Sequence, residues 1–229
     1  MRALLPSVLA AAIAVAVGRQ DPEQPPPLRM TVTVGGVAHQ VVDGVEQVVD
    51  VAGAPTKLRV DVAPLRRFAA GGVAFDFPRD MVFEFEDSGV LQIWTLEGSD
   101  LTVMVQRFKL GTADEFVTET LTQMAANFAE VLNDEPQKPE PCVVAAGGVD
   151  RPAQRVRFTI AEHPMTNTAF GIDLGKGKGC VMVMLQDSCG EDGAPSAEHE
   201  AFLQLLATSF ELTAQARPKS KPKPEAGGR

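Results

Sequence analysis

Ser188 and Cys189 are adjacent residues that could act as nucleophiles, and they follow a predicted strand. A serine or cysteine becomes a nucleophile when a base takes its proton, and the chain has three histidines, His39, His163 and His199. The Gly-x-Ser-x-Gly elbow of many hydrolases is absent around Ser188, and no pattern links a histidine to this loop. We therefore predict no catalytic residues. A hydrolase that uses Ser188 or Cys189 is the alternative.

The stretch from Gly175 to Gly179 alternates glycine with lysine, as a phosphate-binding loop might suggest. A phosphate loop needs a helix directly behind it, so that backbone N–H groups and the helix N-terminus meet the anion. An apolar strand follows here instead, which predicts a hairpin loop. Lys176 and Lys178 remain candidates for contact with an acidic partner.

Metal binding is not indicated by the spacing of the histidines. None of them has a second histidine, a cysteine or a pair of carboxylates at ligand spacing. His199 is flanked by Glu198 and Glu200, but neighbouring positions of a helix point in different directions. The sequence predicts neither a metal nor a cofactor.

The chain has three cysteines, Cys142, Cys180 and Cys189. Cys180 and Cys189 lie near opposite ends of one predicted strand, beyond the separation of about 7 Å that a disulfide spans. In a meander, Cys142 starts at the end of the sheet where Cys189 leaves it. We therefore expect a Cys142–Cys189 disulfide with Cys180 buried and free, and three reduced thiols are the alternative.

Trp94 is the single tryptophan, and it lies in a strand whose other face carries Leu91, Ile93 and Thr95. On an open sheet face Trp94 would anchor a binding partner. Against the long predicted helix it would belong to the core. Both interpretations stay open, and Trp94 is kept as a candidate binding residue.

Composition limits the class of protein. A chain of 229 residues with 45% hydrophobic and 22% charged residues has room for a sizeable core and is not disordered throughout. Its net charge of -9 argues against nucleic acid as a partner.

The two ends differ from the middle. Residues 1–18 join Arg2 to an apolar run and small-residue cleavage sites, which predicts a signal peptide; an uncleaved anchor is the alternative. Residues 19–27 form a Pro-rich linker. We expect an exported chain, periplasmic or extracellular, that is soluble after cleavage.

Residues 214–229 form a basic tail rich in proline and lysine. It contains Lys219, Lys221 and Lys223, which are candidates for contact with an anionic surface polymer or lipid. A disordered tail that only raises solubility is the alternative.

Residues 28–67 lack helical periodicity and predict a small β-meander. Turn signals such as Gly-Gly and Asp-Gly separate four β-rich runs. These runs cover residues 30–34, 37–42, 45–51 and 57–62. So small a meander is expected to lean on the region that follows.

Residues 68–213 predict a larger domain with four strands, a helix, four strands and a second helix. The first helix covers residues 112–132, with a Thr112–Glu115 capping box, and the second covers residues 196–210, with Ser196 as N-cap. The apolar stripe of the first helix consists of Val117, Leu121, Met124, Phe128 and Val131. This order predicts an α+β fold, in which two helices pack on an antiparallel sheet.

Three landmarks carry a resemblance. They are the opening Gly72-Val73-Ala74-Phe75-Asp76-Phe77-Pro78, the capped helix that follows the strand starting at Leu101, and the closing Thr208-Ser209-Phe210. Together they resemble the PsbP-like fold, shared by DcrB-type envelope proteins and a eukaryotic Ran-binding factor, over roughly residues 68–213. The resemblance implies an α/β/α sandwich that binds or supports other proteins, usually without catalysis.

The function expected from these observations is that of an exported, non-catalytic protein-binding or envelope-support module. Its partner would be another envelope protein. A hydrolase with a site near Ser188 and Cys189 is one alternative. A cell-surface adaptor that binds anionic polymer through its basic tail is the other.

Overall fold

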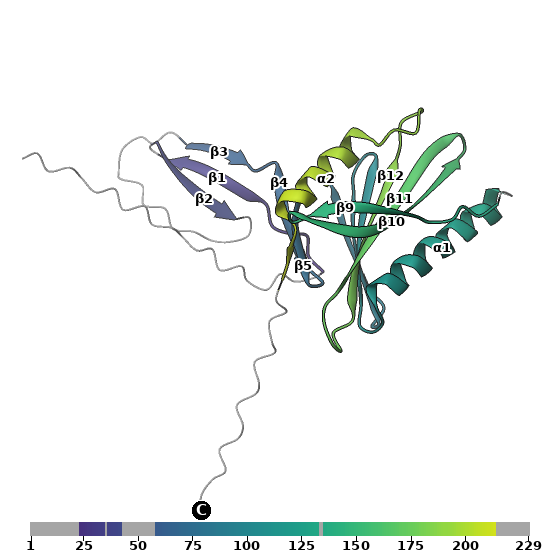
Figure 1. Cartoon of the computed structure of the whole chain (residues 1–229). Coiled ribbons are helices and arrows are strands. Elements are labelled where there is room, and N and C mark those ends of the chain that lie inside the picture. The colour runs from purple at the N-terminus through teal and green to yellow at the C-terminus, as the bar shows by residue number, and fades with distance from the viewer. Residues whose placement is uncertain (1–22, 35, 43–57, 133–134, 214–229) are drawn as a thin grey trace, which may run out of the picture.

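A computed structural model describes residues 23–34, 36–42, 58–132 and 135–213. Strands account for 52% of the described residues and helices for 19%. The expected α/β/α sandwich is therefore wrong, because this part of the chain is mostly β and holds only two helices (Figure 1). None of its helices is long and apolar enough to cross a membrane. The predicted signal peptide, the 45–51 strand and the basic tail lie outside the described residues.

A seven-stranded antiparallel sheet forms the centre of the molecule, with the strand order β6-β7-β8-β12-β11-β10-β9. Its strands are β6 (Val82–Asp87), β7 (Leu91–Glu97), β8 (Leu101–Phe108), β9 (Glu140–Ala146), β10 (Val149–Ile160), β11 (His163–Asp173) and β12 (Cys180–Ser188). β12 is central and buried over Cys180–Leu185, as its continuous apolar run indicates. Among the described residues, β6 and β9 are the two edge strands of this sheet.

Helix α1 (Ala113–Leu132) covers one face of this sheet over β10, β11 and β12. Its start matches the predicted capping box, because the Glu115 carboxylate accepts from the Thr112 N–H at 3.3 Å and from its hydroxyl at 2.7 Å. The buried residues of α1 are Ala113, Val117, Leu121, Ala125 and Ala129. Because these buried residues are four positions apart and a helical turn has about 3.6 residues, the buried stripe winds slowly around the helix. Val131, which the sequence placed in the apolar stripe, is therefore 77% exposed.

The opposite face is covered by helix α2 (Ala197–Ser209) together with a second sheet of order β13-β5-β4. Its strands are β4 (Leu65–Ala70), β5 (Val73–Pro78) and β13 (Glu211–Leu212). The ring of Phe75 in β5 packs edge-on against that of Phe202 in α2, with centroids 5.8 Å apart. The rings of Phe68 in β4 and Trp94 pack in the same way, with centroids 5.9 Å apart. Strands supply much of this layer, and for that reason a second helical layer does not form.

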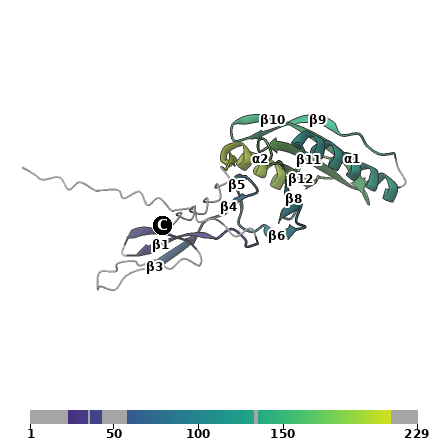
Figure 2. The ribbon, with the colours of Figure 1, turned by 90° about the horizontal axis from the view of Figure 1, so that it is seen from below.

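The N-terminal sheet has the order β2-β1-β3, with β1 (Arg29–Val34) between β2 (Val37–Val42) and β3 (Leu58–Val62). Figure 2 shows β1 and β3 apart from the group formed by β9–β12 and both helices. Arg66 of β4 holds this sheet near the rest by donating to the Pro26 carbonyl at 2.7 Å. β4 itself runs across the boundary predicted after residue 67.

Candidate functional site

The candidate nucleophile Cys189 lies beside a buried carboxylate at the end of β12. Asp187 is 1% exposed, and its Oδ2 lies 3.5 Å from the Cys189 Sγ and 3.7 Å from the His199 Nδ1. The same oxygen accepts from the Ser196 N–H at 3.2 Å. The structure thus brings together Cys189 and one of the three histidines that the sequence offered.

The cap of α2 positions this cluster. Ser196 is the N-cap, as predicted, and its Oγ accepts from the His199 N–H at 3.1 Å. Because α2 starts beside the end of β12, a residue in the first turn of α2 lies next to the last residues of that strand. His199 therefore becomes buried next to Asp187.

The order of the three groups does not suit nucleophilic catalysis. In a relay the imidazole stands between nucleophile and carboxylate, whereas here the carboxylate stands between thiol and imidazole. Burial raises the pKa of the Cys189 thiol, and the charge of Asp187 raises it further. Burial lowers the pKa of His199. A protonated thiol and a neutral imidazole do not form a thiolate–imidazolium pair.

A cleft of about 360 Å³ adjoins this cluster, between the C-terminal half of α1, β10, the start of β11 and the loop after β12. Phe128 and Phe158 stack in its wall with ring centroids 4.1 Å apart, and Cys189 also lines it. The charged Arg157 in the wall is paired with Glu140 at 3.1 Å. The cleft can accept an apolar group, and its lining also contains the polar side chains of Gln137, Thr159 and Thr166.

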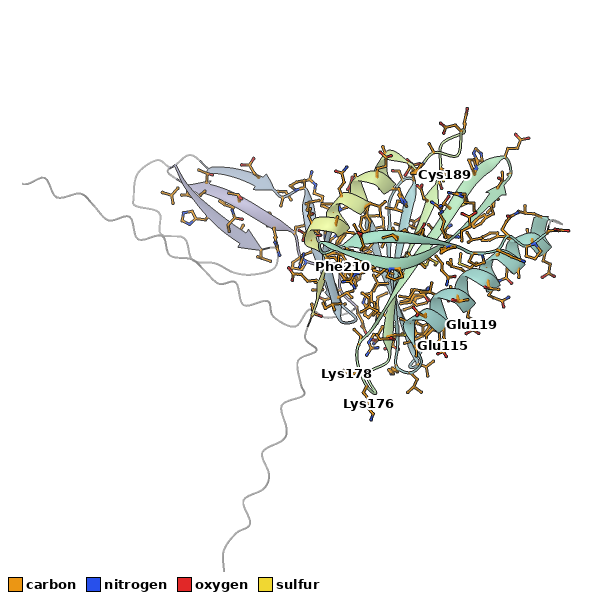
Figure 3. All side chains as sticks on the ribbon, viewed as in Figure 1. Glu115, Glu119, Lys176, Lys178, Cys189 and Phe210 are labelled. Carbon is orange, nitrogen blue, oxygen red and sulfur yellow. The ribbon has the colours of Figure 1, made fainter. Side chains whose placement is uncertain are left out.

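The glycine-lysine stretch forms the hairpin loop between β11 and β12, with Lys176 and Lys178 exposed. The buried Arg107 guanidinium holds this loop, donating to the carbonyls of Lys178 and, at 3.1 Å, Cys180. Figure 3 shows Lys176 and Lys178 at one end of the molecule and Cys189 at the other. The lysines and the candidate nucleophile therefore do not form one site.

The structure corrects two predictions about the site residues. Trp94 is 1% exposed, with its ring against Phe68 and 5.3 Å from Phe85, so it belongs to the core and cannot anchor a partner. The Cys142–Cys189 disulfide is also wrong.

The strand order explains the error over the disulfide. All three cysteines are free. β9, which carries Cys142, lies three strands from β12, roughly 14 Å at the usual strand spacing.

Lys219, Lys221 and Lys223 lie outside the described residues.

A feature that the sequence did not single out is the outer edge of β6. The Ser88 N–H donates to the Leu91 carbonyl at 3.0 Å, which fixes the alternation of hydrogen bonds in the β6–β7 pair. By this alternation the backbone groups of Glu84 and Glu86 face β7, and those of Phe83, Phe85 and Asp87 face outward. No strand pairs with this edge among the described residues.

The side chains of β6 divide between the two faces of the sheet. Phe83 and Phe85 are half-buried and pack against the core, and Glu84 and Glu86 are exposed on the other face. The alternating Met81-to-Glu86 pattern indicated these faces in the sequence. It could not indicate that β6 would be an edge.

Comparisons with known proteins give little further direction. No family model and no curated protein matches the chain. Among solved structures, a crystal structure of a protein from Bacteroides thetaiotaomicron VPI-5482 is similar with a TM-score of 0.39 and 15% identity, covering 67% of this chain. The match spans half of that protein's length. The PsbP-like resemblance stays a prediction. No cluster of metal-binding side chains occurs within the described ranges.

Proposed function

We propose that this chain is a non-catalytic protein-binding module that holds an extended segment of its partner as an added strand on β6. The observation that carries the proposal is the open edge of β6, with outward backbone groups at Phe83, Phe85 and Asp87. An edge of this kind binds a peptide through main-chain hydrogen bonds, and alternate side chains provide the selectivity. An exported location and a partner in the cell envelope remain predictions from the sequence.

The side chains of β6 define the chemistry of the partner. In an antiparallel pair, residues directly opposite each other have their side chains on the same face. A residue opposite Phe83 or Phe85 extends the apolar face, and one opposite Glu84 or Glu86 meets a carboxylate. The preferred partner is therefore a strand that alternates apolar and basic residues.

A labelled synthetic peptide, Val-Lys-Val-Arg-Val-Lys-Val, tests the proposal by fluorescence anisotropy with the full chain. In the proposed antiparallel pair the valine N–H groups face β6 and those of the basic residues face solvent. We expect binding to be lost when the valines are N-methylated and kept when the basic residues are. Equal loss with both peptides, or no binding of the parent peptide, would overturn the proposal.

Charge reversal on the protein gives a second readout. We expect Glu84→Lys with Glu86→Lys to weaken peptide binding about tenfold, because two favourable cross-strand pairs become repulsive. Glu162→Lys with Glu191→Lys is the matched control, since both are exposed carboxylates outside β6. An equal effect of the control pair would show that only net charge matters.

A further inference from the structure

Among the described residues, β3 is a second open edge. Within these ranges β3 pairs with β1 on one side only, and the Ala63 N–H donates to the Arg29 carbonyl at 2.7 Å. The alternation set by this bond directs the backbone groups of Leu58, Val60 and Val62 outward. Phe83 and Phe85 of β6 also combine an apolar side chain with outward backbone groups.

The chain already contains the register in which these edges would meet. β4 follows β3 and β5 precedes β6, and β4 pairs with β5 antiparallel with Leu65 opposite Pro78. One step further, the Arg79 N–H donates to the Pro64 carbonyl at 2.9 Å. Continued in the same register, this ladder places Val60 opposite Phe83 and Leu58 opposite Phe85.

The hydrogen-bond alternation agrees as well. Pro64 and Arg79 form a hydrogen-bonded pair, so every second pair beyond them is also of this type. These pairs are Val62 with Met81, Val60 with Phe83, and Leu58 with Phe85. They involve the backbone groups that already face outward on β3 and β6.

Charge complementarity points to the same register. Arg59 falls opposite Glu84, so a cation meets one of the exposed carboxylates of β6. Asp61 falls opposite Val82 and not opposite a carboxylate. Opposite charges at cross-strand positions are favourable, and like charges there are not.

We propose that β3 pairs with β6 of the same chain, which joins the N-terminal sheet to the seven-stranded sheet and closes the β6 edge. In the structure the ladder stops at Pro64: the Met81 N–H turns to the Pro78 carbonyl at 3.3 Å, and the Val62 carbonyl accepts from Arg79 Nη1 at 3.3 Å. Pairing exchanges these two bonds for the two that a hydrogen-bonded pair of Met81 and Val62 makes. This inference deepens the proposed function, because β3 then competes with a partner strand for β6.

Disulfide trapping in the full chain tests the register. Val60→Cys with Phe83→Cys places two cysteines at a hydrogen-bonded antiparallel pair, whose Cα separation of about 5.5 Å suits a disulfide. Val60→Cys with Glu84→Cys is the control, because those side chains would lie on opposite faces. We expect mild oxidation to give an intramolecular disulfide in the first variant only. Equal trapping in both, trapping only between two copies, or no trapping would overturn the inference.

Hydrogen exchange of residues 82–87 provides a test that needs no new cysteine. We expect Arg59→Glu to speed exchange there about threefold, from the loss of one cross-strand pair, and Glu84→Arg to do the same. The combined variant restores the pair and slows exchange again. No change in either single variant, or no recovery in the combined one, would count against β3 as the occupant of the edge.

The trapped protein also separates this inference from the proposed function. The oxidised Val60→Cys, Phe83→Cys variant should bind the Val-Lys-Val-Arg-Val-Lys-Val peptide at least tenfold more weakly than the same variant in its reduced form. Peptide binding without any trapping would leave the proposed function standing and refute the role of β3. Trapping with undiminished peptide binding would show that partner strands do not use β6.

Discussion

The two halves of the seven-stranded sheet are built from the same antiparallel ladder, but they differ in what covers them. β12 has α1 on one face and lies over the apolar core on the other, and it is buried over Cys180–Leu185. β6 has its phenylalanines on the core and its carboxylates in solvent. The continuous apolar run of β12 reflects a strand that is covered on both faces. The strict alternation of β6 reflects a strand that is covered on one face only.

This difference separates stability from recognition. Covered strands contribute buried apolar area and leave no backbone group for a partner. An edge strand with one open face contributes less, but it presents a row of backbone groups and selective side chains. The edge strand β6 is therefore better suited to binding a partner strand than the covered strand β12.

The covered half should show the largest loss of stability on truncation. Leu121 of α1 is fully buried against the sheet, so we expect Leu121→Ala to cost about 2–5 kcal/mol of unfolding free energy. Ile93 lies in β7 on the same face of the sheet and is half-buried. We expect Ile93→Ala to lower the unfolding free energy by less than about 1.5 kcal/mol. Urea unfolding measures both, and equal costs would contradict the comparison.

The end of β12 should show the next largest effect. Asp187→Ala leaves the Ser196 N–H without its acceptor, and we expect a cost of about 1–3 kcal/mol. Asp150→Ala at an exposed position is the control, with an expected change within about 0.5 kcal/mol. If both variants unfold at the same urea concentration, Asp187 has no structural role.

Acid should destabilise the fold through His199, which is buried next to the end of β12. Burial lowers the pKa of His199 in the folded state, so the unfolded chain binds a proton more readily. The stabilising contribution is full above the unfolded pKa of about 6.5 and is lost as pH falls below it. We expect the drop in thermal midpoint between pH 7.5 and pH 5.5 to be smaller in His199→Gln, and an unchanged drop would refute this assignment.

Local signals in the sequence predicted local structure well. Thr112 with Glu115, and Ser196, placed the starts of both helices, because a cap depends only on residues a few positions away. β4 was missed since Arg66 and Arg67 obscure its alternation, and their partners lie far along the chain: the Pro26 carbonyl, Asp76 and Glu211. Distant partners of this kind leave no local pattern.

The errors over the candidate site have one physical cause. Which strands become neighbours depends on contacts between distant segments, and this order decided three outcomes. It separated Cys142 from Cys189, buried Trp94 between two layers and left β6 at an edge. The alternation of β6 was readable in the sequence, but its position in the sheet was not.

The cysteines offer the finest measure of the contrast between centre and edge. Burial raises the pKa of Cys180, on the central strand, to about 11, and it raises the pKa of Cys142, on the edge strand β9, and of Cys189 as well. Because iodoacetamide reacts with the thiolate and not with the thiol, it should label Cys180 slowest in the folded chain at pH 8. Mass spectrometry of tryptic peptides gives the three rates, with unfolded chain in urea as the control. Labelling of Cys180 as fast as Cys142 would mean that the centre of the sheet opens as readily as its edge.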